Sequence, residues 1–177
     1  SMSEALDRKR LFLVGNLSIF MIGLGFAVRA SIASDIQADI FNQMNLARSA
    51  ALVGEVLGAT FIGFALTLLF GSALVDKVGM RAMMLFSALG YIGGSLAVAI
   101  ASFMPLSGIT YWLIYIGFLL TGLGWGAVEA ASNPMITAVY PDEKTRRLNI
   151  LHAWWPAGVV VGGLAGLAFS ALDLPWQ

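Results

Sequence analysis

Long uninterrupted apolar segments constrain the fold of this chain more than any other feature. A helix needs about 20 mostly apolar residues to cross the roughly 30 Å hydrocarbon core of a membrane. Five segments of that length follow one another, covering residues 11–34, 50–75, 82–104, 109–132 and 150–172. Because a segment in lipid must satisfy its backbone polar groups internally, we expect all five to be α-helices.

The composition fits this interpretation. Apolar residues make up 59% of the 177 positions and charged residues only 11%, whereas soluble domains carry about 25% charged residues. The net charge of zero gives no reason to expect nucleic acid, and the absence of cysteine excludes disulfides and thiolate metal sites. No spacing typical of a metal site, a nucleotide site or a catalytic triad is visible. We therefore expect an all-α, polytopic membrane helix bundle that is not an enzyme and needs no cofactor.

Basic residues predict how the helices are oriented. The N-terminal tail, the second connection and the fourth connection hold eight basic residues, Arg8, Lys9, Arg10, Lys77, Arg81, Lys144, Arg146 and Arg147. The opposite connections hold only Arg48. Because cytoplasmic segments are enriched in Lys and Arg, we expect residues 1–10 to form a cytoplasmic tail.

The connections between the five helices are expected to be polar and to lack further secondary structure. They cover Asp35–Arg48, Asp76–Arg81, Met104–Gly108 and Tyr140–Asn149. Glycines at Gly90, Gly93 and Gly94 and at Gly158, Gly162, Gly163 and Gly166 predict close helix packing, because small residues let helix backbones approach.

The second connection contains the most specific motif, Gly-Ser-Ala-Leu-Val-Asp-Lys-Val-Gly-Met-Arg at residues 71–81. It resembles the signature loop of the major facilitator superfamily, roughly G-x-L-x-D-R-x-G-R-R, although the leading glycine falls one residue early. The matching positions are Leu74, Asp76, Lys77, Gly79 and Arg81. Gly79 permits a tight turn where a side chain would obstruct it. The resemblance implies a gating loop that helps to hold one conformational state. An ordinary polar link between helices is the alternative.

Two further stretches resemble the fucose permease and glucose/galactose transporter family of sugar:proton symporters. Residues 122–134 carry the pattern G-x-x-E-x-x-x-N-P, and residues 148–158 are similar to the family's next helix, which often has glutamine where this chain has His152. The resemblance implies that residues 11–177 form the N-terminal half of a transporter, ending at the start of a sixth helix. Transport would then need a missing C-terminal half or a second copy, in a membrane expected to be the bacterial inner membrane.

Glu129 is the first candidate for a functional residue, because a carboxylate inside an apolar segment is costly unless it is paired or faces water. Desolvation favours its neutral form, so reversible protonation is feasible. The resemblance implies a role in sugar binding and proton coupling. The alternative is a structural carboxylate that pairs with an arginine.

Arg29 is the second charged residue inside an apolar helix, and three roles remain open for it. It could pair with Glu129, which would offset two burial costs at once. It could bind an anionic substrate, since guanidinium groups suit carboxylates and phosphates. It could also snorkel toward the nearby helix end.

Four more residues complete the candidate solute site. Asn16, Asn133 and His152 offer hydrogen-bond donors and acceptors, and Trp155 offers an aromatic face. We therefore expect a secondary transporter of a small polar solute, with sugar favoured and a proton as a candidate coupling ion. A transporter of an organic anion and a facilitator half that binds or scaffolds without transporting are the alternatives.

Overall fold

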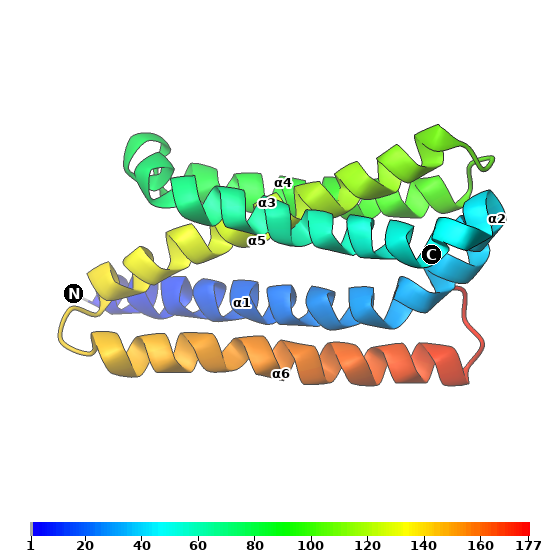
Figure 1. Ribbon diagram of the computed structural model, residues 1–177. Helices are drawn as coiled ribbons and strands as arrows, with labels where there is room; N and C mark the ends of the chain where they lie inside the picture. The colour runs from blue at the N-terminus through cyan, green and yellow to red at the C-terminus, as the bar shows by residue number, and fades with distance from the viewer. Residues whose placement is uncertain (1) are drawn as a thin grey trace.

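The computed structural model describes residues 2–177 and consists of helices joined by short connections (Figure 1). No strand occurs in this part of the chain. The five long helices are α1 (Met2–Ile36), α3 (Ser49–Val78), α4 (Met80–Ser102), α5 (Gly108–Val139) and α6 (Lys144–Ala171). The predicted all-α membrane bundle with five long helices is confirmed.

Four of the five long helices are longer than the apolar segments that predict them, because polar residues continue the helix beyond the hydrocarbon, whereas α4 has the predicted length and begins two residues earlier. The structure has four continuous helical stretches that are long and apolar enough to cross a membrane. The first of them, Asp7–Val78, includes both α1 and α3, because the segment between them is also helical. The tail predicted at residues 1–10 is likewise part of α1 from Met2 onward.

The expectation of an unstructured link at Asp35–Arg48 is wrong. This segment forms a π-helical turn (Gln37–Phe41), the short helix α2 (Asn42–Asn45) and a 3₁₀ turn (Leu46–Arg48). Ile40 and Phe41 are fully buried in a core shared with α3 and α5. The polar composition of the segment conceals this apolar pair, and burying the pair fixes the chain as it reverses direction.

The connection between α3 and α4 is shorter than predicted, because only Gly79 lies outside the two helices. Its backbone has φ 85° and ψ 157°, which an L side chain rarely adopts. Gly79 N–H donates to the Val75 carbonyl at 2.8 Å, and the Gly79 carbonyl accepts from Met83 N–H at 3.2 Å. One glycine thus ends α3 and starts α4.

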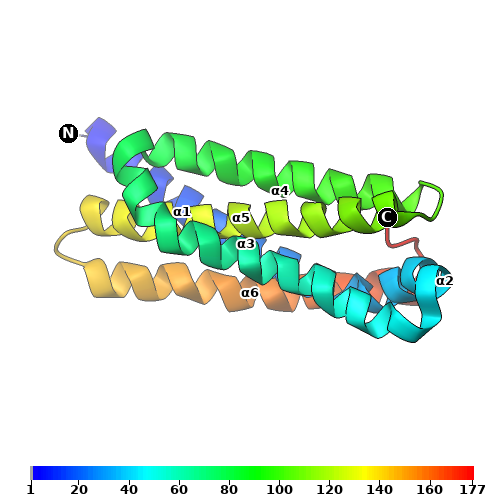
Figure 2. The same ribbon diagram turned by 45° about the horizontal axis from the view of Figure 1, so that its top comes forward.

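Helix packing concentrates in three pairs, α1 with α6, α3 with α5, and α4 with α5 (Figures 1 and 2). Glycine lies at the closest approach of each pair. A Cβ on Gly158 would collide with the Phe20 carbonyl of α1, and one on Gly122 would collide with the Thr60 carbonyl of α3. Between α4 and α5, a Cβ on Gly117 would lie 2.7 Å from the Gly94 carbonyl oxygen.

The predicted glycine packing faces are therefore confirmed in part. Gly90, Gly94, Gly158 and Gly162 contact the backbone of a neighbouring helix, and Gly166 lies against Ser31. Gly93 and Gly163 face open space, because consecutive helix positions point about 100° apart and only one of two adjacent glycines can face the same partner.

The N-terminal start of α1, the α3–α4 turn and the α5–α6 loop all lie at one end of the bundle (Figure 1). The eight basic residues counted above therefore gather at that end, which we call the basic end. The outer faces of the helices are apolar, with Leu69, Leu89 and Leu167 each more than half exposed. Such a surface suits lipid rather than water.

Candidate functional site

Glu129 lies on α5, half-buried, toward the basic end of the bundle. Asn133, one helical turn later on the same face, donates from Nδ2 to Glu129 Oε2 at 3.5 Å. His152 of α6 lies within electrostatic range of the carboxylate. No ion pair to Glu129 forms within the described residues. Three residues that the sequence analysis selected therefore share one region.

Asn16 of α1 lies close to the same region. Its neighbour Gly15 packs against Met135, Ile136 and Leu151, which places Asn16 at the level of the α5 turn that carries Asn133. The Asn16 side chain is buried, and its Oδ1 has no hydrogen-bond partner.

Other buried polar atoms around this turn also lack partners. They are Asn133 Oδ1, Ser132 Oγ and Trp125 Nε1. Buried polar atoms are almost always hydrogen-bonded in proteins, to protein or to ordered water. The concentration of such atoms where α1 meets α5 therefore marks a place where water or a polar solute would be bound.

Trp155 of α6 belongs to an aromatic cluster built from four helices. The ring of Phe26 on α1 lies at its centre, 5.6 Å from Trp155, 6.2 Å from Trp125 on α5 and 6.4 Å from Phe61 on α3, centroid to centroid. Trp155 remains 37% exposed. Its ring is thus held in place while one face stays accessible.

Arg29 occupies a different environment, enclosed by aromatic rings of α4 and α5. Its guanidinium carbon lies 4.8 Å from the ring centroid of Trp125, 5.4 Å from Tyr91 and 5.5 Å from Phe118. Arg29 Nη1 donates to the Gly25 carbonyl at 3.4 Å. That carbonyl is one turn back toward the middle of α1, so the side chain does not snorkel toward the helix end.

The hypothetical Arg29–Glu129 ion pair does not form. The ion pairs of the described residues are Arg48–Glu55, Arg146–Glu143 and Arg147–Glu143. Each of the two charges inside the bundle has its own surroundings, and anion binding by Arg29 stays a prediction.

A cavity of about 390 Å³ opens beside Arg29, between α1, α4 and α5, and we call it the Arg29 cavity. A second cavity of about 240 Å³ lies farther along the same α1–α4 groove. Tyr91 of α4 lines both cavities, and its hydroxyl donates to the Met21 carbonyl at 3.1 Å. This side chain therefore separates the two cavities.

The signature loop lies at the basic end, where Asp76, Lys77 and Arg81 are exposed. Within the described part of the chain, Asp76 forms neither an ion pair nor a side-chain hydrogen bond. Gly79 makes the tight turn that the sequence predicts. The gating role of the loop remains a prediction.

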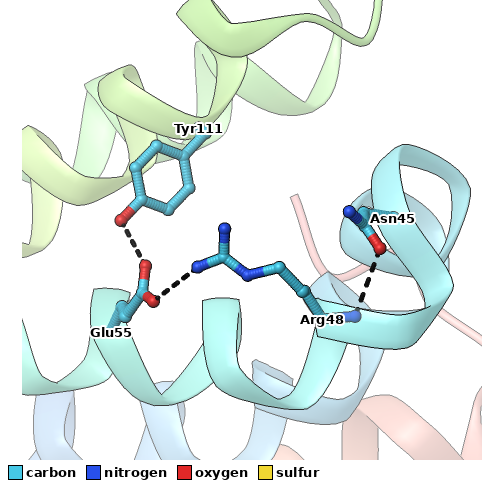
Figure 3. A network of polar contacts seen from close by, with 4 residues as sticks. All are labelled: Asn45, Arg48, Glu55 and Tyr111. Atoms are coloured by element: carbon cyan, nitrogen blue, oxygen red, sulfur yellow. Dashed lines mark hydrogen bonds and ion pairs between the residues drawn. The ribbon is translucent and has the colours of Figure 1, made fainter.

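One polar network at the opposite end was missed by the sequence analysis. Arg48 Nη2 lies 3.2 Å from Glu55 Oε1, and the Tyr111 hydroxyl donates to Glu55 Oε2 at 2.7 Å (Figure 3). Asn45 Oδ1 accepts from Arg48 N–H at 3.3 Å. Glu55 thus joins α3 to α5. Tyr111 is 56 residues away from Glu55, so sequence spacing could not reveal the contact.

The comparison with protein families decides the class of this molecule. The family model described as Major Facilitator Superfamily matches residues 11–177. The chain belongs to this superfamily. It is therefore an integral, multi-pass membrane protein, in agreement with its apolar helices.

Relatives in the superfamily are transporters whose names give different substrates. The chain is 29% identical to the chloroplastic ascorbate transporter of Arabidopsis thaliana over 70% of its own length and 21% of that protein. It is 28% identical to the multidrug resistance protein MdtH of Shigella dysenteriae, over 93% of this chain and 37% of that protein. It is 26% identical to the D-xylose transporter of Levilactobacillus brevis, over 88% of this chain and 32% of that protein.

The chain thus spans about a fifth to two fifths of the length of these curated relatives. No solved structure gives a significant match.

Proposed function

We propose that residues 11–177 are the N-terminal bundle of a secondary transporter that moves a small polar solute by alternating access. The observation that carries this proposal is the polar turn of α5, where Glu129 and Asn133 lie beside His152 of α6 and Asn16 of α1. Transporters of this type bind solute near the middle of the membrane, between two such bundles. A second bundle, from a C-terminal half or a second copy, would complete the site.

A sugar or sugar-like compound is the favoured solute. The unpartnered Asn16 and Asn133 oxygens can accept hydrogen bonds from hydroxyl groups, and the accessible ring of Trp155 offers an apolar face. The D-xylose transporter and the minor myo-inositol transporter IolF of Bacillus subtilis are relatives whose names fit polyhydroxylated solutes. Likeness to the fucose permease family is part of this proposal.

Glu129 is the proposed coupling residue. Its carboxylate is half-buried, has no arginine or lysine partner, and is held by one long hydrogen bond. Such a group can gain or lose a proton without breaking a strong interaction. In this proposal His152 of α6 is the basic neighbour that acts on the Glu129 carboxylate.

The signature loop is the proposed gating element, on the side that we assign to the cytoplasm of a bacterial inner-membrane protein. Asp76, Lys77 and Arg81 are exposed and free to contact a second bundle. Asp76→Asn is therefore expected to change the balance between inward- and outward-facing states and to leave solute binding intact. Chemical labelling of a single cysteine placed in the proposed solute site would measure that balance. Loss of expression of Asp76→Asn would instead indicate that Asp76 is needed for folding.

Transport of an organic anion is the second candidate. Arg29 has no carboxylate partner, and relatives include the ascorbate transporter and the probable anion transporter 4 of rice.

A membrane module that does not transport is the third candidate function. Solute uptake into proteoliposomes separates it from the first two.

A thermal-shift panel of sugars and organic acids on the purified chain tests the proposal, because a ligand that binds only the folded state raises its melting temperature. We expect stabilisation by a sugar in the wild type and its loss in Glu129→Gln. Asp173→Asn is a matched control, since Asp173 is exposed and lies at the opposite end of the bundle. Stabilisation that survives in Glu129→Gln would remove the polar turn from the site.

A further inference from the structure

Arg29 is a buried charge without a counter-ion in this chain. It is 9% exposed, and it forms no ion pair within residues 2–177. Its hydrogen bond to the Gly25 carbonyl of its own helix is long, at 3.4 Å, and its other polar contact is with the uncharged Tyr91 hydroxyl. A guanidinium has five N–H donors, so most of its hydrogen-bonding capacity is unused. An unpaired charge inside a membrane helix is expensive, so an anion bound beside it would be stabilising.

The three aromatic rings explain how Arg29 is held but do not replace that anion. Trp125, Tyr91 and Phe118 attract the cation through their ring faces and restrict its movement. Aromatic rings accept no conventional hydrogen bond and carry no net charge. The Tyr91 hydroxyl donates to the Met21 carbonyl and can also accept from Arg29, but it carries no negative charge that would balance the guanidinium. The rings therefore position a cation whose remaining donors face the Arg29 cavity.

The lining of the Arg29 cavity limits what this anion can be. The volume of about 390 Å³ lies within the range of small-molecule sites, about 300–1,000 Å³. Most of the wall is apolar, with Leu24, Val28 and Ile32 from α1 and Leu96 and Val98 from α4. Arg29 is the one charged side chain that lines it, and the uncharged polar residues Ser95, Thr121 and Gln177 also contribute, together with Trp176 near the end of the chain. A strongly hydrophilic anion would leave its hydroxyl groups facing apolar side chains, whereas an anion with an apolar body would match the wall.

We propose that the Arg29 cavity binds an amphipathic anion, with its carboxylate or phosphate on the guanidinium of Arg29 and its apolar body between α1 and α4. This site is separate from the polar turn that carries Glu129. Two sources can supply such a molecule, a soluble organic acid or an anionic phospholipid of the surrounding bilayer. Both share the same chemistry and would use the same residue.

Binding of octanoate to the chain in phosphatidylcholine nanodiscs tests the proposal, with the heat of mixing with empty nanodiscs subtracted. Octanamide is a neutral molecule of nearly the same shape, and gluconate is an anion without an apolar body. We expect octanoate to bind at least tenfold more tightly than octanamide, because a charge-assisted hydrogen bond to arginine contributes roughly a 10- to 100-fold gain in affinity. It should also bind more tightly than gluconate, because only octanoate buries an apolar body against the wall. Equal binding of octanoate and octanamide, or tighter binding of gluconate, would overturn the proposal.

Two variants and a control assign the binding to Arg29. Arg29→Gln should lose the preference for octanoate over octanamide, and Arg29→Lys should retain part of it, because lysine keeps the charge but lacks the planar fork. Arg48→Gln is the matched control, since Arg48 is exposed and pairs with Glu55. A preference that survives in a folded, monodisperse Arg29→Gln would overturn the proposal. If that variant does not fold, the comparison of the three probes on the wild type and on Arg29→Lys still decides whether the guanidinium of Arg29 binds the anion.

The source of the anion is distinguished by native mass spectrometry after exchange into phosphatidylglycerol or phosphatidylcholine. Phosphatidylglycerol that stays bound to the wild type and is displaced by octanoate indicates a lipid site. Octanoate binding without retained phosphatidylglycerol indicates a soluble acid. Neither result depends on solute transport, so failure here would leave the proposed function of the polar turn untouched.

Discussion

Arg29 and Glu129 are both charged residues inside membrane-length helices, but their surroundings differ in kind. Arg29 is enclosed by three aromatic rings and an apolar cavity between α1, α4 and α5. Glu129 is half-buried, with amide and imidazole neighbours from α5 and α6. Trp125 lies on the wall of both regions, since it is in contact with Arg29 and one turn before Glu129.

This difference shows that two opposite charges in one small bundle need not neutralise each other. An ion pair would satisfy both and leave neither available to a ligand. Separate surroundings instead leave both charges without a counter-ion among the described residues, as the two proposed binding roles require. The following predictions test that separation, from the largest expected effect to the smallest.

Gly158→Leu should damage the Glu129 region most, because a side chain there collides with the α1 backbone and pushes away the helix that carries His152 and Trp155. We expect the free energy of unfolding to fall by about 3 kcal/mol or more, which lowers the melting temperature by roughly 6–12 °C for a chain of this size. Gly163→Leu is the control on the same helix, because Gly163 faces open space. Similar melting temperatures for the two variants would contradict the close α1–α6 contact.

Gly79→Ala should act on the other region, because the α3–α4 turn positions the helix that carries Tyr91 against Arg29. Its positive φ is strained for alanine, at a cost of about 1–3 kcal/mol. Gly93→Ala, within α4 and facing open space, should not destabilise the protein. Thermal unfolding in detergent checks both, and an unchanged melting temperature for Gly79→Ala would show that the turn adopts another conformation.

Glu129→Gln should weaken binding of the polar solute by roughly tenfold, the effect of losing a charged hydrogen-bond acceptor. Binding should also become less dependent on pH between about pH 5 and 8, because glutamine can neither take up nor release a proton. His152→Gln separates the two contributions, since any pH dependence left in Glu129→Gln should vanish in the double variant. An unchanged pH profile in Glu129→Gln would exclude it as the coupling residue.

Tyr111→Phe should have the smallest effect, about 0.5–1 kcal/mol, because the Glu55 carboxylate that it contacts is partly exposed and screened by water. A double-mutant cycle with Glu55→Gln should give a coupling energy of similar size. Coupling well above 1 kcal/mol would mean that the network in Figure 3 is shielded from water, by lipid or by a second bundle.

The sequence predicted the helices well and the contacts poorly, for a physical reason. Length and hydropathy determine which segments span a membrane, so the five helices and the tight turn at Gly79 could be predicted. The π-helical and 3₁₀ turns after α1 could not, because their cause is the burial of Ile40 and Phe41 in a core formed by distant helices.

The candidate site shows the same limit. The i, i+4 spacing of Glu129 and Asn133 predicted one shared face, and the structure places both there. The environment of Arg29 was not predictable, because its aromatic neighbours come from α4 and α5 and no local spacing connects them. The Arg29–Glu129 pair was a reasonable hypothesis from charge alone, but it ignored the bulk of Trp125 on the wall of both regions.

A double-mutant cycle on the stability of Arg29→Gln, Glu129→Gln and the combined variant tests the separation of the two charges most directly. Residues without contact contribute additively, within about 0.5 kcal/mol. We predict additive changes in unfolding free energy, with the double variant equal to the sum of the single variants. If the double variant loses less unfolding free energy than the two single variants together, by about 2 kcal/mol or more, Arg29 and Glu129 form an ion pair and the account is contradicted.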